Sequence, residues 1–302
     1  MRTDFITAAH RPIGRALATA MAAAALLLGG TAAARQNVDV LYAGSLVNLM
    51  ERDIGPAFDR ASGDHFRGFA GGSKLLANEI RARLRRADVF VSAARAVNAP
   101  LMSGVGRWES GYVAFARSPL VIGYNAASRF ASAFTTRPWY EVLQSKGIRL
   151  GRTDPRLDPK GVLTVRLLHR AEVYYRLPGL ALRVLGVPEN PAQVLPEEAL
   201  VGRLQSGQLD AGFFYSTETS EAAIPAIGLP PAIAPSAVYT VAVLRNAPHR
   251  RAAVAFVAFL LGPRGRRLMR QHGLEVQRPV VTGDVRWLPG DLRAQRADDS
   301  RQ

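Results

Sequence analysis

The sequence contains no cysteine, and this absence limits the chemistry that is open to it. Disulfides, thiolate nucleophiles, cysteine-ligated metals and a lipid anchor on an N-terminal cysteine are all excluded. Lysine is nearly as scarce, since Lys74, Lys146 and Lys160 are the only lysines among 39 basic residues. Arginine therefore carries almost all of the net charge of +15.

Signatures of catalysis are also missing. The five histidines do not show the spacing of a metal site. There is no Gly-x-Ser-x-Gly turn, and no serine has an evident base. Glu218 and Glu221 follow Tyr215 in a polar segment, where carboxylates are expected to lie on the surface. We therefore expect no enzymatic activity and no cofactor.

The positive charge does not gather into a nucleic-acid-binding pattern. The arginines are scattered along the chain, and the only dense run is Arg81–Arg86. A cationic run of this kind suits the solvated C-terminal end of an amphipathic helix, where it favours the helix dipole. The sequence therefore predicts no nucleic-acid partner.

The first residues have the layout of an export signal. Basic residues Arg2, Arg11 and Arg15 precede a small apolar run over 16–30, and Ala32–Ala34 offers small residues for a signal peptidase. We predict a signal peptide over 1–34, cleaved after Ala34. No later apolar run is long enough to cross a bilayer, so the mature chain is expected in the periplasm without stable membrane insertion.

Strands and helices are predicted to alternate after the signal. A strand at Val38–Leu41 leads into a helix over 46–62 with apolar residues at helical spacing, and a second strand spans 65–69. Another helix follows, and Ala87–Ser92 returns as a buried strand. This βαβαβ order predicts a parallel sheet with its ligands at the carboxyl ends of the strands.

Two long extended segments divide the chain. Val113–Tyr124 contains Pro119, which suits an edge or crossing strand, and Val238–Leu244 is extended and is expected to cross back. A second α/β unit lies between them. The predicted domains are lobe 1 (35–117 plus 242–285), lobe 2 (118–241) and a C-terminal tail (286–302).

Three short turns of small or capping residues stand before predicted helices. They are Gly44-Ser45, Gly72-Ser73 and Asp158–Gly161. A helix start leaves backbone N–H groups unpaired, and its dipole favours negative charge, so a strand-turn-helix junction can hold an anion. We predict that the first two turns share one rim and that the third faces them across a cleft.

Each of these residues also fits an ordinary structural role. Ser45 and Ser73 can be plain helix caps, and Asp158 followed by Pro159 is a good N-cap with proline in the first turn. Lys160 can simply point to solvent. One turn alone is weak evidence, and the prediction depends on three turns converging.

The motifs together resemble a known family. The segments include Tyr-Ala-Gly-Ser45, Gly-Gly-Ser73, Ala-Asp-Val-Phe-Val-Ser92 and Arg-Thr-Asp-Pro-Arg-Leu-Asp-Pro-Lys-Gly161. They look like the periplasmic molybdate/tungstate-binding proteins of ABC importers, nearest the tungstate branch. The resemblance runs from about Val38 to Val280. The segment from Phe256 to Gly265 is similar to solute-binding proteins at large and is less specific.

The resemblance implies roles for particular residues. Ser45 and Ser73 match the serines that donate to oxyanion oxygens. Asp158, Pro159 and Lys160 match a segment that offers backbone amides and, in the tungstate branch, a carboxylate for the metal atom of the oxyanion. Tyr239 matches a tyrosine on the return strand, although tyrosine in such an apolar run also suits the core. Phe214 falls where the tungstate branch carries a second carboxylate.

This departure at Phe214 bears on the ligand. With Asp158 alone, six-coordinate binding of the metal atom is in doubt, and a tetrahedral anion held by donors is favoured. Lys160 adds a cation that offsets Asp158. A phosphate monoanion needs an acceptor, which Asp158 can supply. The same position also suits a core residue or a cleft wall.

These observations lead to one prediction and two alternatives. We expect an α/β fold of the type II-like periplasmic binding kind, with two lobes, each a mainly parallel sheet flanked by helices, joined by two extended crossovers. We expect a monomer that captures molybdate or tungstate and delivers it to the membrane permease of an ABC importer. The alternatives are a sulfate- or phosphate-binding protein, and a secreted protein that kept the fold and lost the ligand.

Overall fold

The computed structural model describes residues 35–187 and 189–290. The predicted signal peptide and residues 291–302 of the predicted tail lie outside this range. No helix in the described ranges is both long enough and apolar enough to span a bilayer.

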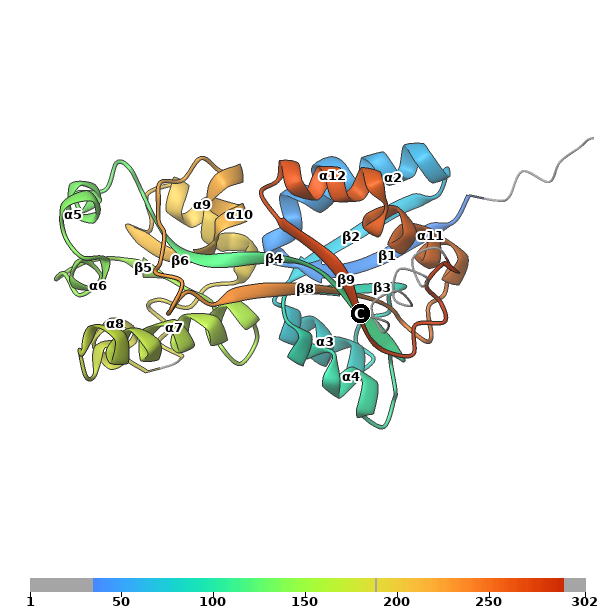
Figure 1. Cartoon of the computed structure of the whole chain (residues 1–302), viewed down its shortest axis with the longest axis horizontal. Helices are drawn as coiled ribbons and strands as arrows, with labels where there is room; N and C mark the ends of the chain where they lie inside the picture. The colour runs from blue at the N-terminus through green and yellow to red at the C-terminus, as the bar shows by residue number, and fades with distance from the viewer. Residues whose placement is uncertain (1–34, 188, 291–302) are drawn as a thin grey trace, which may run out of the picture. The chain divides into compact units, whose positions relative to one another are not determined.

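The strands form two connected sheets, which we call sheet A and sheet B (Figure 1). Sheet A holds β1 (Asn37–Ala43), β2 (His65–Gly71), β3 (Val89–Ser92), β8 (Ser236–Val243), β9 (Glu275–Gly283) and the first part of β4 (Gly111–Tyr124). Sheet B holds the second part of β4 with β5 (Leu150–Gly151), β6 (Ala211–Tyr215) and β7 (Ala226–Ile227). The order along the main path is β2-β1-β3-β8-β4-β6-β5.

Helical segments follow most strands. Near the chain start they are η1 (Gly44–Leu46), the π-helical η2 (Leu49–Ile54), α2 (Gly55–Ser62), α3 (Ser73–Arg81), η3 (Arg95–Val97) and α4 (Ala99–Ser103). The middle of the chain forms α5 (Ala131–Thr136), α6 (Trp139–Val142), α7 (Pro159–Tyr175), α8 (Leu180–Leu185), η4 (Glu197–Ala199), α9 (Leu200–Gln205) and α10 (Ser216–Glu221). The last are α11 (Arg250–Leu261) and α12 (Pro263–Gln271).

The strand β4 passes from one sheet to the other, and Pro119 marks the point of passage. Pairing of β4 with β9 ends at Arg117, and pairing with β6 begins at Leu120. Proline has no N–H to donate, so it fits where one neighbour has ended and the next has not begun. In Figure 1, β4 and β8 run side by side between the two groups of helices.

The sheets are mixed, which corrects the expectation of mainly parallel sheets. β1 is parallel to β2 and to β3, and β5 is parallel to β6, as the βαβ rhythm predicted. The crossing strands β8 and β4 are antiparallel to their neighbours, because each enters its sheet from the opposite end. The α/β class itself is confirmed.

Helix ends follow local chemistry. α2 stops at Gly63, whose φ of 75° is the left-handed conformation that glycine adopts most easily. The arginine run does not extend a helix as predicted, because α3 ends at Arg81 and Arg83 has a φ of 59°. This correction shows how a short left-handed turn can end a helix despite favourable side-chain spacing.

The packing near the C-terminus was not predicted from the sequence. The strand β9, which we did not predict, continues to Gly283 along β4. Beyond it, Trp287 and Leu288 are buried in the same apolar cluster as Phe256 and Val241. Residues 286–288 therefore belong to the packed protein and not to a tail. The burial of the large side chains of Trp287 and Leu288 holds them there without any repeating sequence pattern.

Candidate anion-binding site

The first two predicted turns lie side by side on sheet A. β1 ends at Ala43 and pairs in parallel with β2, whose last residue Gly71 stands opposite. Ser45 follows β1 and is 4% exposed, while Ser73 follows β2 as the first residue of α3 and is fully buried. The pairing of the parallel strands therefore brings both serines to one edge of the sheet.

The third turn, Asp158–Gly161, is in contact with the second turn, Gly72-Ser73, although the two turns belong to different sheets. The N–H of Leu75 in α3 donates to the carbonyl of Leu157 at 2.9 Å. A Cβ on Gly72 would lie 2.8 Å from that same carbonyl oxygen and 3.3 Å from the Cβ of Asp158. Only glycine allows this approach, so Gly72 is required for the contact between the turns.

Asp158 acts as the N-cap of α7 and keeps one oxygen unused. Its Oδ1 accepts from the Lys160 N–H at 2.8 Å and from the Thr153 hydroxyl at 3.0 Å. Oδ2 is buried and has no hydrogen-bond partner among the described residues. Burial raises the pKa of Asp158, and the charge of Lys160 opposes this rise.

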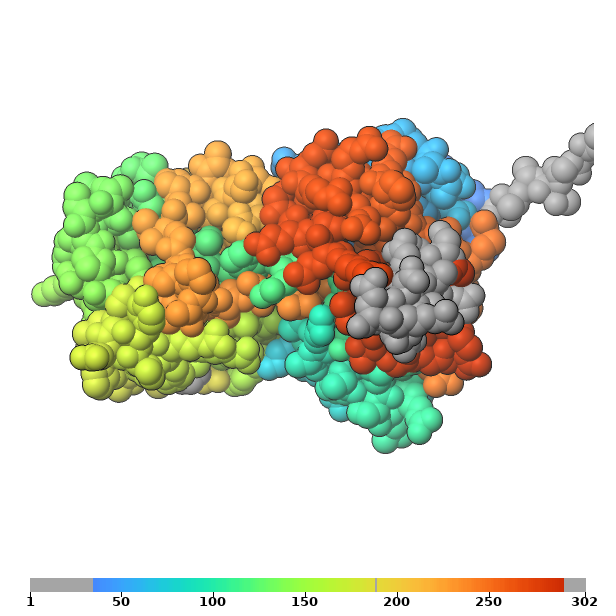
Figure 2. Space-filling view, viewed as in Figure 1, coloured from blue at the N-terminus to red at the C-terminus, as the bar shows by residue number. Residues whose placement is uncertain are grey.

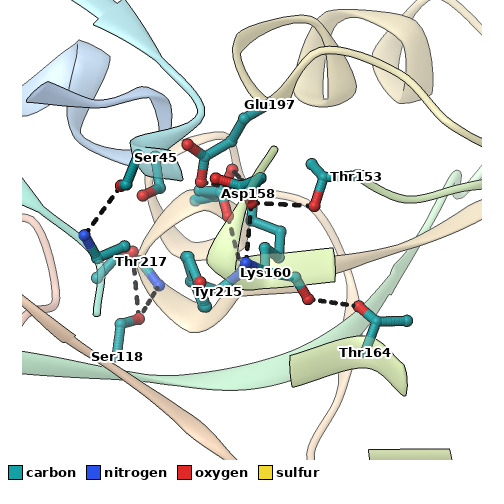
Figure 3. Close-up of polar contacts among 12 residues, drawn as sticks. Ser45, Ser118, Thr153, Asp158, Lys160, Thr164, Glu197, Tyr215 and Thr217 are labelled. Atoms are coloured by element: carbon teal, nitrogen blue, oxygen red, sulfur yellow. Dashed lines mark hydrogen bonds and ion pairs between the residues drawn. The ribbon is translucent and has the colours of Figure 1, made fainter. Parts of the chain in front are cut away.

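Lys160 is fully buried and pairs with two carboxylates, which corrects the expectation that it could face solvent. Its Nζ donates to Glu218 Oε1 at 2.7 Å and lies 3.4 Å from Glu197 Oε1. Burial opposes its charge, but Glu218, Glu197 and Asp158 outweigh this effect and raise the pKa of Lys160 to about 12. Figure 3 shows Lys160 between Asp158, Glu197 and Tyr215.

Glu218 is buried as well, although the sequence suggested a surface position. Its Oε2 accepts from the Tyr215 N–H at 2.7 Å, so Glu218 caps the backbone at the start of α10. With Lys160 on Oε1, both of its oxygens have donors. The spacing of three residues between Tyr215 and Glu218 was the signal that could have revealed this role.

Glu197 is the least satisfied acid of the cluster. It is 3% exposed, and neither of its oxygens has a hydrogen-bond partner in the described part of the chain. A Cβ on Gly44 would lie 3.0 Å from its Oε2, so the acid approaches the first turn closely. Burial raises the pKa of Glu197 well above its usual range, and the charge of Asp158 adds to the effect. The only sequence signal for Glu197 was its position in the first turn of a predicted helix.

Three buried hydroxyls accompany these acids. Tyr239 donates to Ser45 Oγ at 3.1 Å, and the Ala93 N–H donates to Ser73 Oγ at 3.1 Å. Each serine therefore accepts a hydrogen bond and keeps its own proton for another acceptor. The hydroxyl of Tyr215 is buried without a partner among residues 35–187 and 189–290, and its ring lies 5.0 Å from Lys160 Nζ.

The structure does not bring every predicted residue to this cluster. Phe214 packs in a separate apolar cluster with Leu200 and Leu204, because successive side chains of β6 point to opposite faces. Pro159 is buried in the first turn of α7, next to the cap. Tyr215, Glu197 and Glu218, which we did not select from the sequence, lie in the cluster instead.

The arrangement can hold a small anion through hydroxyl and backbone donors. Free protons on Ser45, Ser73 and Tyr215 suit the oxygens of such an anion. The unused oxygens of Asp158 and Glu197 are acceptors, which a proton-bearing anion can use. No described group has the placement of a nucleophile with its base.

A second acidic group, formed by Asp39, Asp88 and His249, lies elsewhere on sheet A. One ligand atom from each of these residues lies within 4.8 Å of the others. The oxygens of Asp88 accept from the N–H of His249 at 2.6 Å and that of Asp39 at 2.8 Å. Arg67 donates to both oxygens of Asp39. These bonds connect β1 with β2, with the residue before β3 and with the residue before α11, so the group has a structural explanation.

Comparison with known proteins identifies the family. The sequence profile of the bacterial extracellular solute-binding proteins matches residues 38–275. This chain belongs to that family. It is a family of binding proteins, which agrees with the absence of enzymatic activity predicted above.

Individual relatives carry more specific names. The molybdate/tungstate-binding protein WtpA of Thermococcus kodakarensis is 27% identical over 268 residues, which cover 73% of this chain and 75% of the relative. The fold is similar to that of the periplasmic molybdate-binding protein of Azotobacter vinelandii, with a TM-score of 0.62 and 17% identity over 80% and 99% of the two chains. The sulfate-binding protein SubI of Mycobacterium tuberculosis gives a TM-score of 0.60 and 18% identity over 87% and 91%.

Proposed function

We propose that this solute-binding protein captures molybdate or tungstate between sheets A and B. The anion would be held by the hydroxyls of Ser45, Ser73 and Tyr215 and by backbone amides at the start of η1, α3 and α7. Tyr239 would orient Ser45 through its hydrogen bond of 3.1 Å. Asp158, Pro159 and Lys160 would form the facing wall.

One observation carries this proposal. Ser45 and Ser73 have buried hydroxyls where two parallel strands end, and the unpaired buried hydroxyl of Tyr215 belongs to a ring next to Lys160 in the capped helix α7. An unpaired buried donor costs about 1–3 kcal/mol, so such groups persist where a ligand satisfies them. The name of the Thermococcus relative supports molybdate or tungstate as that ligand.

Access to the site requires movement. Ser45, Ser73, Asp158 and Lys160 are at most 4% exposed, so an anion cannot reach them in this arrangement. We propose that the predicted lobes open and close about β4 and β8, which are the strands that run between the sheets. Closure would exclude water and strengthen each hydrogen bond to the anion.

The proposed setting is the periplasm, where the loaded protein would deliver its anion to the membrane permease of an ABC importer. Membership of an extracellular solute-binding family supports export, and the relatives named for molybdate support this cargo. The monomeric state and the cleavage site after Ala34 stay predictions.

Isothermal titration of the mature chain with molybdate, tungstate, sulfate and phosphate tests the proposal. We expect saturable binding of one anion per chain for molybdate or tungstate, with sulfate and phosphate at least 100-fold weaker, which corresponds to about 2.7 kcal/mol. Tight binding of sulfate or phosphate would replace the proposed ligand. Absence of binding for all four anions would indicate that the fold has lost this function.

A further inference from the structure

A histidine outside the anion site links the two sheets. His272 follows α12 and precedes β9, so it belongs to the sheet A side of the protein. Its Nε2 lies 2.8 Å from Asp53 Oδ2, and its Nδ1 lies 2.5 Å from Glu221 Oε1. Asp53 is in η2 on the same side, whereas Glu221 ends α10, which follows β6 of sheet B.

The neighbouring backbone is in contact at this point. A Cβ on Gly273 would lie 3.8 Å from the Cβ of Ser220 in α10. Figure 2 shows the orange-red atoms of α12 against the gold atoms of the α9–α10 region. The side chains of His272 and Glu221 are only 16% and 11% exposed, so solvent screens their interaction weakly.

The elements that His272 joins are the ones that carry the anion site. η2 follows the Gly44–Leu46 turn directly, and α10 follows Tyr215 and holds Glu218. A bond between η2, His272 and α10 therefore forms only when the two walls of the site are together. Opening of the sheets would separate His272 from Glu221 and leave the contact with Asp53 intact.

We propose that His272 is a positioning residue that holds the anion site closed when its imidazole is protonated. Imidazolium donates from both nitrogens, so it satisfies Asp53 and Glu221 at once. Neutral imidazole donates from one nitrogen only, and the second carboxylate then faces a lone pair. The expected effect on ligand affinity rests on the proposed function. Closure itself can be measured without ligand.

Other charged groups on the packed elements do not bond to the ring. Glu51 of η2 accepts from the Tyr42 hydroxyl, and Glu218 of α10 is paired with Lys160. Arg52 on η2 and Arg270 on α12 have no ion pair in the described ranges. Glu275 on β9 likewise makes no ion pair with a described residue. The pH response should therefore follow His272 and its two carboxylates.

The direction of the pH effect depends on whether the open or the closed state gives His272 more carboxylate partners. The closed state offers His272 two carboxylates and the open state offers one, so protonation favours closure. The closed fraction should therefore fall as pH rises and the imidazole loses its proton. Affinity for molybdate should fall with it by about tenfold or more, the size expected of one charge-assisted hydrogen bond.

Spin labels can report closure directly because the chain has no native cysteine. The substitutions V105C and L182C place labels at two exposed positions. Val105 follows α4 on the sheet A side, and Leu182 lies in α8 of the middle segment. In the ligand-free protein, pulsed electron paramagnetic resonance should show a longer-distance population that grows as pH rises. In H272Q and in E221Q that population should already be present at the lowest pH measured and should not change with pH.

H169Q is the matched control, since His169 pairs with Glu172 inside α7 and spans no gap between the sheets. It should keep the native pH response in both distance and affinity. The proposal is overturned if H272Q responds to pH as the native chain does, or if the native chain shows no response. Should none of the oxyanions bind, the proposed function fails, and the label distances still decide the role of His272.

Discussion

The two acidic groups of this protein both bring together residues that are far apart in the chain, and they differ in how their oxygens are used. In the group of Asp39, Asp88 and His249, every carboxylate oxygen has a donor from the backbone, from His249 or from Arg67. In the cluster around Lys160, the oxygens of Glu197 and one oxygen of Asp158 have no hydrogen-bond donor within the described chain, and Glu197 has only the longer ion pair of 3.4 Å with Lys160. Completed hydrogen bonds indicate a structural role, whereas unused buried groups indicate a binding site.

Burial separates the two groups further. Asp39 is partly exposed and its partner Arg67 is half exposed, so solvent helps to stabilise their charges. Asp158, Glu197 and Glu218 are at most 5% exposed, and Lys160 forms ion pairs with two of them, Glu197 and Glu218. Such a concentration of charge costs folding free energy, which a protein tolerates where the groups contribute to function.

The largest predicted effect comes from removing the single cation of the cluster. K160M should lower the free energy of unfolding by about 3–5 kcal/mol, because it leaves Glu197 and Glu218 buried without their partner. Urea denaturation at pH 7 measures this loss. K146M, at a lysine outside the cluster, should have little effect. Equal stability of K160M and the native chain would refute the ion-pair interpretation.

Loss of the two serine hydroxyls should weaken binding, and it should also lower stability, because the buried Ala93 N–H loses its acceptor on Ser73. The double variant S45A/S73A is expected to reduce the affinity for molybdate by about 3 kcal/mol, since each hydroxyl supplies one charge-assisted hydrogen bond. Titration calorimetry measures the change, and S103A on the exposed part of α4 is the control. Unchanged affinity would place the anion elsewhere in the protein.

A substitution in the Asp39–Asp88–His249 group should lower stability and leave anion binding unchanged. D88N is expected to lower the free energy of unfolding by about 2 kcal/mol, because an amide cannot accept all the bonds that the carboxylate accepts. Molybdate affinity should not change, and thermal denaturation with added Mn²⁺ should show no metal-specific stabilisation. A rise in melting temperature with Mn²⁺ in the native chain alone would show that this group is a metal site.

The smallest expected effect is that of E197Q. The folded protein raises the pKa of Glu197, so its stability contribution is favourable below the unfolded value and declines as pH rises towards the folded value. E197Q removes this decline and should be more stable than the native chain at pH 8. At pH 5 the two should be nearly equal in thermal denaturation. An E197Q variant that loses stability at pH 8 would show that the charge itself is required.

Much of the fold was predictable because local patterns carried it. The helix from Leu46 towards Ser62, the cap at Asp158 and the crossing strand with Pro119 all follow from spacing and backbone chemistry. β9 was missed because its strand character depends on pairing with β4 rather than on alternation of its own. Phe214 lies in an apolar cluster, as its alternative role of a core residue predicted, because a one-residue step along a strand turns a side chain to the other face.

The sequence by itself determined which turns can bind an anion. Gly44-Ser45, Gly72-Ser73 and Asp158–Lys160 precede helices, and unpaired amides at helix starts are a local property. Only the tertiary structure decided which acids join them. Glu197 and Glu218 lie far from Lys160 in the chain, and their burial depends on how the two sheets meet. Long-range packing sets the surroundings of a charge, and those surroundings decide whether a carboxylate lies at the surface or in a binding site.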